Sequence, residues 1–142
     1  MKNILLIGGS YGIGLAIAKE IESGNNVFVA SRTNENLEDL NVTHIPFDAL
    51  NDTLDLSTLP AVIDGLVYCP GSINLRPFRG LKPEAFENDL QMNFISLVKV
   101  IQSVLPNLTA SEQSSIVLFS SVAVSMGMPF HTSVAASKGA IE

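Results

Sequence analysis

The chain alternates short apolar runs with stretches in which apolar residues recur at helical spacing. Residues 4–7 form the first run, Ile-Leu-Leu-Ile, which is typical of a strand buried on both faces of a sheet. After a turn rich in glycine, Ile13, Ile17 and Ile21 follow one another every four residues, the spacing of one helix face. This pattern predicts a strand, a tight turn and a helix that stops near Gly24.

Further apolar runs predict the remaining strands of a sheet. They cover residues 27–30, 42–47, 65–68 and 116–119. Before the last of these runs, apolar residues at helical spacing predict one long helix that begins at Pro83 and stops at Pro106. Residues 51–60 leave room only for a short crossover. The order of elements predicts an α/β fold, a doubly wound parallel sheet with strand order 3-2-1-4-5 and right-handed crossovers.

The turn between the first strand and the first helix carries glycines at positions 8, 12 and 14. This G-x-x-x-G-x-G spacing differs from the G-x-G-x-x-G dinucleotide fingerprint, and Leu15 after Gly14 excludes a Walker A loop. The first N–H groups of a helix lack partners and carry partial positive charge. A buried strand, a glycine turn and a helix start therefore form a phosphate site. A turn that only makes a tight corner is the alternative interpretation.

The sequence Gly-Gly-Ser-Tyr-Gly-Ile-Gly at residues 8–14 resembles the cofactor loop of the short-chain dehydrogenase/reductase family. Ile7 stands where the family usually has Thr, and further matches continue to the end of the chain. The resemblance implies a Rossmann-like, dinucleotide-binding domain over residues 1–142 and hydride transfer between a nicotinamide cofactor and a small carbonyl or alcohol substrate. It also implies which residues contact the cofactor, namely Gly8, Ser10, Tyr11, Gly12, Ile13, Gly14, Gly71 and Lys138.

The residues after the second and third strands bear on which cofactor is bound. Ser31 and Arg32 end the second strand, and no carboxylate follows before Glu35. A carboxylate at this place binds the ribose of NAD, whereas an arginine accommodates the 2′-phosphate of NADP. We therefore expect NADP rather than NAD, with an ordinary solvated arginine as the alternative. Asp48 matches the family's aspartate beside the adenine ring, or else caps a turn or helix.

The family resemblance also implies three catalytic residues. Ser121, at the end of the fifth predicted strand, matches the serine that hydrogen-bonds the substrate oxygen, with Ser120 as the competing assignment. Asn93 matches the asparagine that disturbs its helix and helps to hold a water near the catalytic lysine. An ordinary polar contact is the alternative for Asn93. Lys138 matches the lysine of the family's Tyr-x-x-x-Lys motif, which holds the cofactor ribose.

Val134 occupies the tyrosine position of that motif. Valine has no ionisable proton, and the loss of a general acid typically costs about 10² to 10⁴ in rate. His131, three residues earlier, is a candidate acid unless it is a loop or cap residue, and a water bound to Lys138 is another option. Ser125, Ser133 and Ser137 are weaker candidates. The two leading functions are thus an oxidoreductase and a pseudoenzyme that binds NADP as a sensor or structural subunit. A scaffold that binds no dinucleotide is a third.

Composition and charge exclude several classes of protein. Of 142 residues, 46% are hydrophobic and 15% are charged, so we expect a globular domain with a sizeable core. The net charge of −6 argues against nucleic acid and anionic membrane as partners. Cys69 is the only cysteine, which excludes an internal disulfide and suits the cytoplasm. We expect no metal site.

The last residues of the sequence carry no helix stop. Residues 135–142 have a mid-helix pattern, and the fifth strand would be left as an apolar sheet edge. We therefore expect the dinucleotide-binding domain to be incomplete on its C-terminal side. Family members usually pair through the helices that start near Pro83 and near His131. The resemblance thus implies a homodimer or homotetramer for the complete protein.

Overall fold

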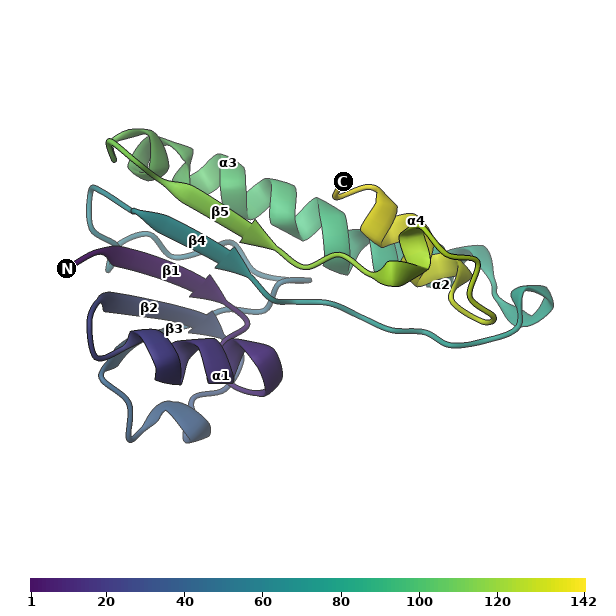
Figure 1. The fold of residues 1–142 in the computed structure, drawn as a ribbon, viewed down its shortest axis with the longest axis horizontal. Helices are drawn as coiled ribbons and strands as arrows, with labels where there is room; N and C mark the ends of the chain where they lie inside the picture. The colour runs from purple at the N-terminus through teal and green to yellow at the C-terminus, as the bar shows by residue number, and fades with distance from the viewer.

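The computed structural model describes all residues from 1 to 142. Five parallel strands form one sheet in the spatial order β3-β2-β1-β4-β5, which confirms the predicted order (Figure 1). The strands are β1 (Asn3–Ile7), β2 (Asn26–Ser31), β3 (Val42–Pro46), β4 (Gly65–Tyr68) and β5 (Ser115–Leu118). β1 lies at the centre, paired with β2 along one edge and with β4 along the other.

The helices cover both faces of the sheet. They are α1 (Gly12–Ile21), α2 (Pro83–Leu90), α3 (Ser96–Thr109) and α4 (Thr132–Gly139), with a π-helical segment, η3 (Gln91–Ile95), between α2 and α3. Short 3₁₀ turns are η1 (Glu35–Leu37), η2 (Phe78–Gly80) and η4 (Val122–Val124). No helix combines the length and the apolar character that crossing a membrane requires.

Two hydrophobic clusters follow from the alternation of side chains along β1. Leu6 packs in a cluster with Ala18 of α1, whereas Leu5 and Ile7 pack in a larger cluster with Val104 and the rest of the buried face of α3. The two helices therefore hold the sheet from opposite sides, as Figure 1 shows. This arrangement leaves the carboxyl ends of the strands open.

The long helix predicted from Pro83 to Pro106 differs from the prediction in two ways. It is interrupted by η3, and α3 continues past Pro106 to Thr109. Proline removes one backbone donor, but the Pro106 carbonyl still accepts from the N–H of Ala110 at 3.1 Å and from the hydroxyl of Thr109 at 3.1 Å. The predicted stop at Pro106 is therefore wrong by about one turn.

Two connections agree with the prediction. α1 ends at Ile21, and the N–H of Gly24 bonds to the Ile21 carbonyl at 3.4 Å. Residues 47–64, between β3 and β4, contain no helix, so this crossover is short. Its end is held against α3, because the N–H of Ile63 bonds to the carbonyl of Asn107 at 3.0 Å.

β5 is the edge strand on one side of the sheet. Its central residues, Ile116 and Val117, are 43% and 47% exposed. The predicted apolar edge is therefore present in the structure.

Candidate functional site

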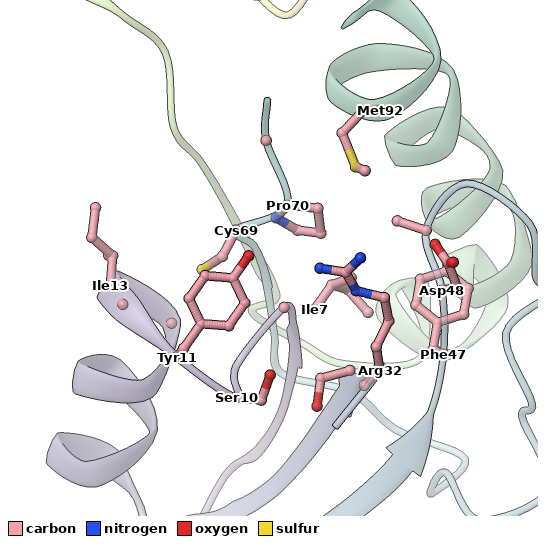
Figure 2. Close-up of a pocket in the computed structure, with 17 residues that line it drawn as sticks. Ile7, Ser10, Tyr11, Ile13, Arg32, Phe47, Asp48, Cys69, Pro70 and Met92 are labelled. Atoms are coloured by element: carbon pink, nitrogen blue, oxygen red, sulfur yellow. The ribbon is translucent and has the colours of Figure 1, made fainter. Parts of the chain in front are cut away.

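A pocket opens at the carboxyl ends of β1, β2 and β4, where doubly wound sheets bind their ligands (Figure 2). Its volume is about 250 Å³, and 17 residues line it. Every residue predicted to contact the cofactor, other than Lys138, belongs to this lining: Gly8, Ser10, Tyr11, Gly12, Ile13, Gly14, Ser31, Arg32, Asp48 and Gly71. The fold thus gathers four segments that are distant in the sequence around one space.

The remaining lining residues were not predicted. They are Ile7, Ala30, Phe47, Ala49, Cys69, Pro70 and Met92. All but Met92 are neighbours of predicted residues at the strand ends. Met92 comes from η3 and faces the other lining residues across the pocket (Figure 2). Nothing in its local sequence pattern indicates this position.

The glycine turn has its shape for two reasons. Gly8 and Gly12 have φ values of +79° and +59°, a region that residues with a side chain rarely adopt. Position 14 must be a glycine for a steric reason, because a Cβ there would lie 2.3 Å from the carbonyl oxygen of Gly8. α1 therefore packs with its backbone directly against the end of β1, and this contact brings its N-terminus to the pocket.

The N-terminus of α1 is open toward the pocket. Tyr11 at the N-cap makes no side-chain cap bond, and the first turn carries no acidic residue. The first N–H of the helix with a backbone acceptor is that of Leu15, which bonds the Tyr11 carbonyl at 3.2 Å. The N–H groups of Gly12, Ile13 and Gly14 remain for a ligand, and the helix dipole favours an anion there.

Side chains of the loop after β2 tie this loop to the glycine turn. The hydroxyl of Thr33 bonds the Ser10 hydroxyl at 3.2 Å, and the Asn36 amide donates to the Ser10 carbonyl at 3.0 Å. Ser31 in turn donates to the Thr33 carbonyl at 2.8 Å. Sequence reasoning missed Thr33 and Asn36, because their partner lies more than twenty positions away.

Arg32 and Asp48 face each other across one end of the pocket. Figure 2 shows the Arg32 guanidinium projecting into the space between Tyr11 and Asp48. The Asp48 carboxylate accepts from the Leu50 N–H and the Asn51 amide, each at 3.0 Å. These bonds, with a smaller contribution from the Arg32 charge, hold the pKa of Asp48 below its usual value. Asp48 therefore caps a turn and also lines the pocket, and its place beside an adenine ring stays a prediction.

Asn93 lies in the π-helical segment and is fully buried. Its Nδ2 is 2.9 Å from the Asp89 carbonyl, 3.0 Å from the Ser72 hydroxyl and 3.1 Å from the Ser137 hydroxyl. The expected disturbance of the helix at Asn93 is present as η3. The amide joins α2, α4 and the loop after β4. We call Ser72, Asp89, Asn93 and Ser137 the polar cluster.

Lys138 lies next to the polar cluster on α4. Its Nζ donates to the Phe119 carbonyl at 2.8 Å. Burial lowers the pKa of the Lys138 ammonium, and burial raises the pKa of the neighbouring Cys69 thiol to about 11. A Cβ on Gly71 would lie 3.5 Å from Lys138 Nζ and 3.2 Å from Asn93 Oδ1. Lys138 and Asn93 therefore converge on Gly71, which is also part of the pocket wall.

Ser120 and Ser121 end β5 in different surroundings. The Ser121 oxygen accepts from the Ala123 N–H at 3.2 Å and caps η4, and Ser121 is half-buried. The Ser120 hydroxyl is exposed and donates to the carboxylate of Glu142. The partly enclosed position of Ser121 favours it over Ser120 as the substrate contact, and that role stays a prediction.

The two positions that concern proton transfer lie at the start of α4. Val134 is 4% exposed and brings no polar atom to the site. His131 is the N-cap residue, and its Nδ1 lies 2.7 Å from the Pro129 carbonyl. A carbonyl only accepts, so Nδ1 carries a proton. This arrangement fits the loop or cap interpretation, and a catalytic role of His131 stays a prediction.

The family model described as short chain dehydrogenase matches residues 2–142. The chain belongs to the short chain dehydrogenase family. It is 31% identical over 121 residues to the PIGF/3-ketodihydrosphingosine reductase fusion protein of Schizosaccharomyces pombe, covering 73% of the chain and 24% of that protein. It is 29% identical over 160 residues to retinol dehydrogenase 8 of Homo sapiens, covering 99% of the chain and 51% of that protein.

Solved structures agree with this membership. A short chain dehydrogenase from Escherichia coli CFT073, complexed with NADPH, has a TM-score of 0.89 at 23% identity, covering 99% of this chain and 67% of that one. The likeness shows the fold. The chain spans about half the length of the human relative and about a quarter of the yeast fusion protein.

In this member of the short chain dehydrogenase family, the candidate site has two parts. The pocket offers unpaired N–H groups and a guanidinium, which bind anions. The polar cluster and Lys138 offer buried hydrogen-bonding groups beside it. The two parts meet at Gly71.

Proposed function

We propose that the chain binds a nicotinamide dinucleotide, NADP in preference to NAD, and carries out hydride transfer with a carbonyl or alcohol substrate as part of an oxidoreductase. The observation that carries this proposal is that ten of the eleven predicted cofactor residues line one pocket beside the open N-terminus of α1. The NADPH in the related Escherichia coli structure supports it. A cytoplasmic location and a homodimer or homotetramer stay predictions.

The residues of the pocket fit the parts of this cofactor. The N–H groups of Gly12, Ile13 and Gly14 suit the pyrophosphate, and the positive end of α1 adds to their attraction. The Arg32 guanidinium suits the 2′-phosphate, because an arginine binds phosphate through two parallel hydrogen bonds. Lys138 suits the ribose hydroxyls near the nicotinamide. The bound cofactor supplies or accepts the hydride.

The chain needs a group that handles the proton of the substrate oxygen. We propose that Lys138, directly or through a bound water, has this task, because Val134 offers no hydroxyl. Burial lowers the pKa of Lys138, which brings its proton closer to the range in which a general acid is effective. Ser121 would hold the substrate oxygen, and Asn93 would support Lys138. His131 remains the alternative acid.

A substrate with an apolar body is the class that we propose for this site. Ile73, Met126 and Phe130 are 67%, 63% and 53% exposed, and they come from the loops after β4 and β5. A hydrogen bond links these two loops, since the Arg76 N–H donates to the Phe130 carbonyl at 3.2 Å. Phe130 has a φ of +67°, a strained value that is typical of functional loops. The two curated relatives are named for retinol and 3-ketodihydrosphingosine, both largely apolar molecules.

A pseudoenzyme that binds NADP without turnover is the second candidate. The buried Val134 at the tyrosine position favours it. In this case the pocket is retained for binding, and the same cofactor residues serve a sensor or a structural subunit.

Equilibrium titration of the full chain with NADPH and with NADH tests cofactor binding. We expect saturable NADPH binding that Arg32→Ala weakens by about ten-fold or more, with a smaller effect on NADH. Arg79→Ala is the matched control, because Arg79 is exposed on η2 and does not line the pocket. Absence of binding by the full chain would overturn both candidates.

Single-turnover oxidation of NADPH with apolar aldehydes and ketones separates the two candidates. Turnover by the wild-type chain identifies an oxidoreductase. Tight binding without turnover, and activity gained only in Val134→Tyr, identifies the pseudoenzyme. Faster turnover of short polar carbonyl compounds than of apolar ones would contradict the proposed substrate class.

A further inference from the structure

Asp89 is a buried carboxylate that neither the pocket nor the proposed reaction uses. It is 3% exposed and is the only buried residue of α2. Its Oδ1 accepts from the Ser72 hydroxyl at 2.6 Å, and its Oδ2 is buried without a partner. Burial of a carboxylate is costly unless its hydrogen bonds compensate. The short bond to Ser72 is therefore the feature to explain.

The bond to Asp89 fixes the direction of the next hydrogen bond. A serine hydroxyl has one proton, and Ser72 gives that proton to Asp89 Oδ1. The Ser72 oxygen can then only accept, and it does so from Asn93 Nδ2 at 3.0 Å. The Asp89 carboxylate thus selects which end of the Asn93 amide faces Ser72.

Two main-chain groups favour the same orientation, and the Ser72 hydroxyl adds to them. The Ser72 N–H points at Asn93 Oδ1 at 3.4 Å, and a backbone N–H only donates. The Asp89 carbonyl, which only accepts, lies 2.9 Å from Asn93 Nδ2. The amide nitrogen therefore faces α2 and α4, and the amide oxygen faces the loop at Gly71.

The amide oxygen of Asn93 and the ammonium of Lys138 both lie near Gly71. A single point above Gly71, the place of a Cβ, is 3.2 Å from Asn93 Oδ1 and 3.5 Å from Lys138 Nζ. An oxygen at this position favours an ammonium, whereas an amide NH₂ group disfavours it. The orientation of Asn93 therefore decides which of its polar groups shares the surroundings of Gly71 with Lys138.

We propose that Asp89 is a positioning residue that, through the Ser72 hydroxyl, fixes the Asn93 amide with its oxygen toward Lys138. Without the carboxylate, the Ser72 proton is free to turn to Asn93, and the amide loses one of the bonds that hold its nitrogen away from Lys138. The proposal rests on the proposed function only for the task given to Lys138.

Few other charged groups act on Lys138. The titratable group that faces it is the Cys69 thiol at the end of β4. α2 also carries Glu84 and Glu87, which are exposed, while η3 and η4 carry no titratable residue. His131 and Glu142 flank α4 in the sequence. Substitution of Asp89 also removes a negative charge from α2, which packs against α4. Asp89→Asn removes the same charge and keeps an acceptor for Ser72, so it separates this direct effect from the Ser72–Asn93 path.

The experiment is a ¹³C NMR titration of the lysine ε-carbons in the full chain, without cofactor or substrate. The Lys138 signal is assigned by its loss in Lys138→Arg. We expect Asp89→Leu to lower the pKa of Lys138 by about half a unit or more. Asp89→Asn leaves it unchanged, because the new amide oxygen still accepts from Ser72. If Lys138 has the same pKa in Asp89→Leu as in the wild-type chain, the proposal is overturned.

A second pair of variants covers the case in which Asp89→Leu does not fold. Ser72→Ala removes the hydroxyl and is expected to give the same downward shift, whereas Ser72→Thr keeps the hydroxyl and the wild-type titration. A purely structural role of Asp89 would change stability without moving the Lys138 signal. Failure of NADPH binding overturns the proposed function alone, and an unmoved Lys138 titration overturns this inference alone.

Discussion

The glycine turn of the pocket presents main chain, whereas the polar cluster is made of side chains. In the pocket, the turn of residues 8–14 supplies open N–H groups and tight clearances from neighbours in the sequence. In the polar cluster, Asn93 bonds Ser72 and Ser137, which are 21 and 44 positions away. A site built from main chain keeps its shape only if certain residues have no side chain. A site built from side chains keeps its shape only if its polar atoms are hydrogen-bonded to one another. The two regions are therefore sensitive to different substitutions.

The largest expected effect comes from adding one methyl group to the main-chain region. Gly14→Ala places a Cβ 2.3 Å from the Gly8 carbonyl oxygen, and only a shift of α1 away from β1 relieves this contact. We expect a loss of about 3 kcal/mol in the free energy of unfolding, measured by urea denaturation. Gly24→Ala is the control, because nothing lies within 4 Å of its Cβ position. Similar losses in both variants would contradict this account of the turn.

An intermediate effect is expected in the polar cluster. Asn93→Ala removes an amide whose two N–H protons are shared among three oxygens on three segments. The buried oxygens lose a donor, so we expect the free energy of unfolding to fall by about 2 kcal/mol. Asn88→Ala on the exposed side of α2 is the matched control and should stay within about 0.5 kcal/mol of wild type. If Asn93→Ala matched this control, the cluster would contribute nothing to stability.

The smallest effect is a pH dependence at Lys138, where the two regions meet. Burial lowers the pKa of Lys138 from its usual 10.5, so the unfolded chain binds this proton more tightly than the folded chain. Below the folded pKa the buried ammonium therefore costs stability, and the cost disappears as pH rises toward 10.5. We expect the stability of Lys138→Met relative to wild type to decrease as the pH rises from the folded pKa toward 10.5.

Lys99→Met provides the comparison for this measurement, because Lys99 is exposed on α3. Thermal or urea unfolding across the same pH range should show no trend in the difference between Lys99→Met and wild type. A parallel trend in both lysine variants would show that burial of Lys138 is not its cause.

The contrast between the two regions also explains what the sequence allowed us to predict. Gly8, Gly12 and Gly14 are visible as a pattern within seven residues, and Arg32 is placed by the end of a strand. Strand order follows from the alternation of elements and from the rule for right-handed crossovers. Asn93 was identified because an asparagine inside a helix needs a reason, and its bonds supply one.

Ser72 and Asp89 were not found, for a physical reason. An acidic residue between Asn88 and Leu90 on an amphipathic helix resembles a solvated one, and only the packing of α2 against α4 buries it. The helix was predicted to stop at Pro106 because proline has a low helix propensity. Helix propensity takes no account of the hydrogen bonds that the Pro106 carbonyl still accepts in the last turn of α3. Tertiary contacts decide such positions.

The placement of the aromatic hydroxyls has a spectroscopic consequence. These 142 residues contain no tryptophan and two tyrosines. Tyr11 lines the pocket and is 64% exposed, while Tyr68 is buried and donates to the carbonyl of Met92, another lining residue. One tyrosine therefore lies in the pocket wall, and the other is bonded to a residue of that wall. Quenching of their ultraviolet emission would report ligand binding without any added label.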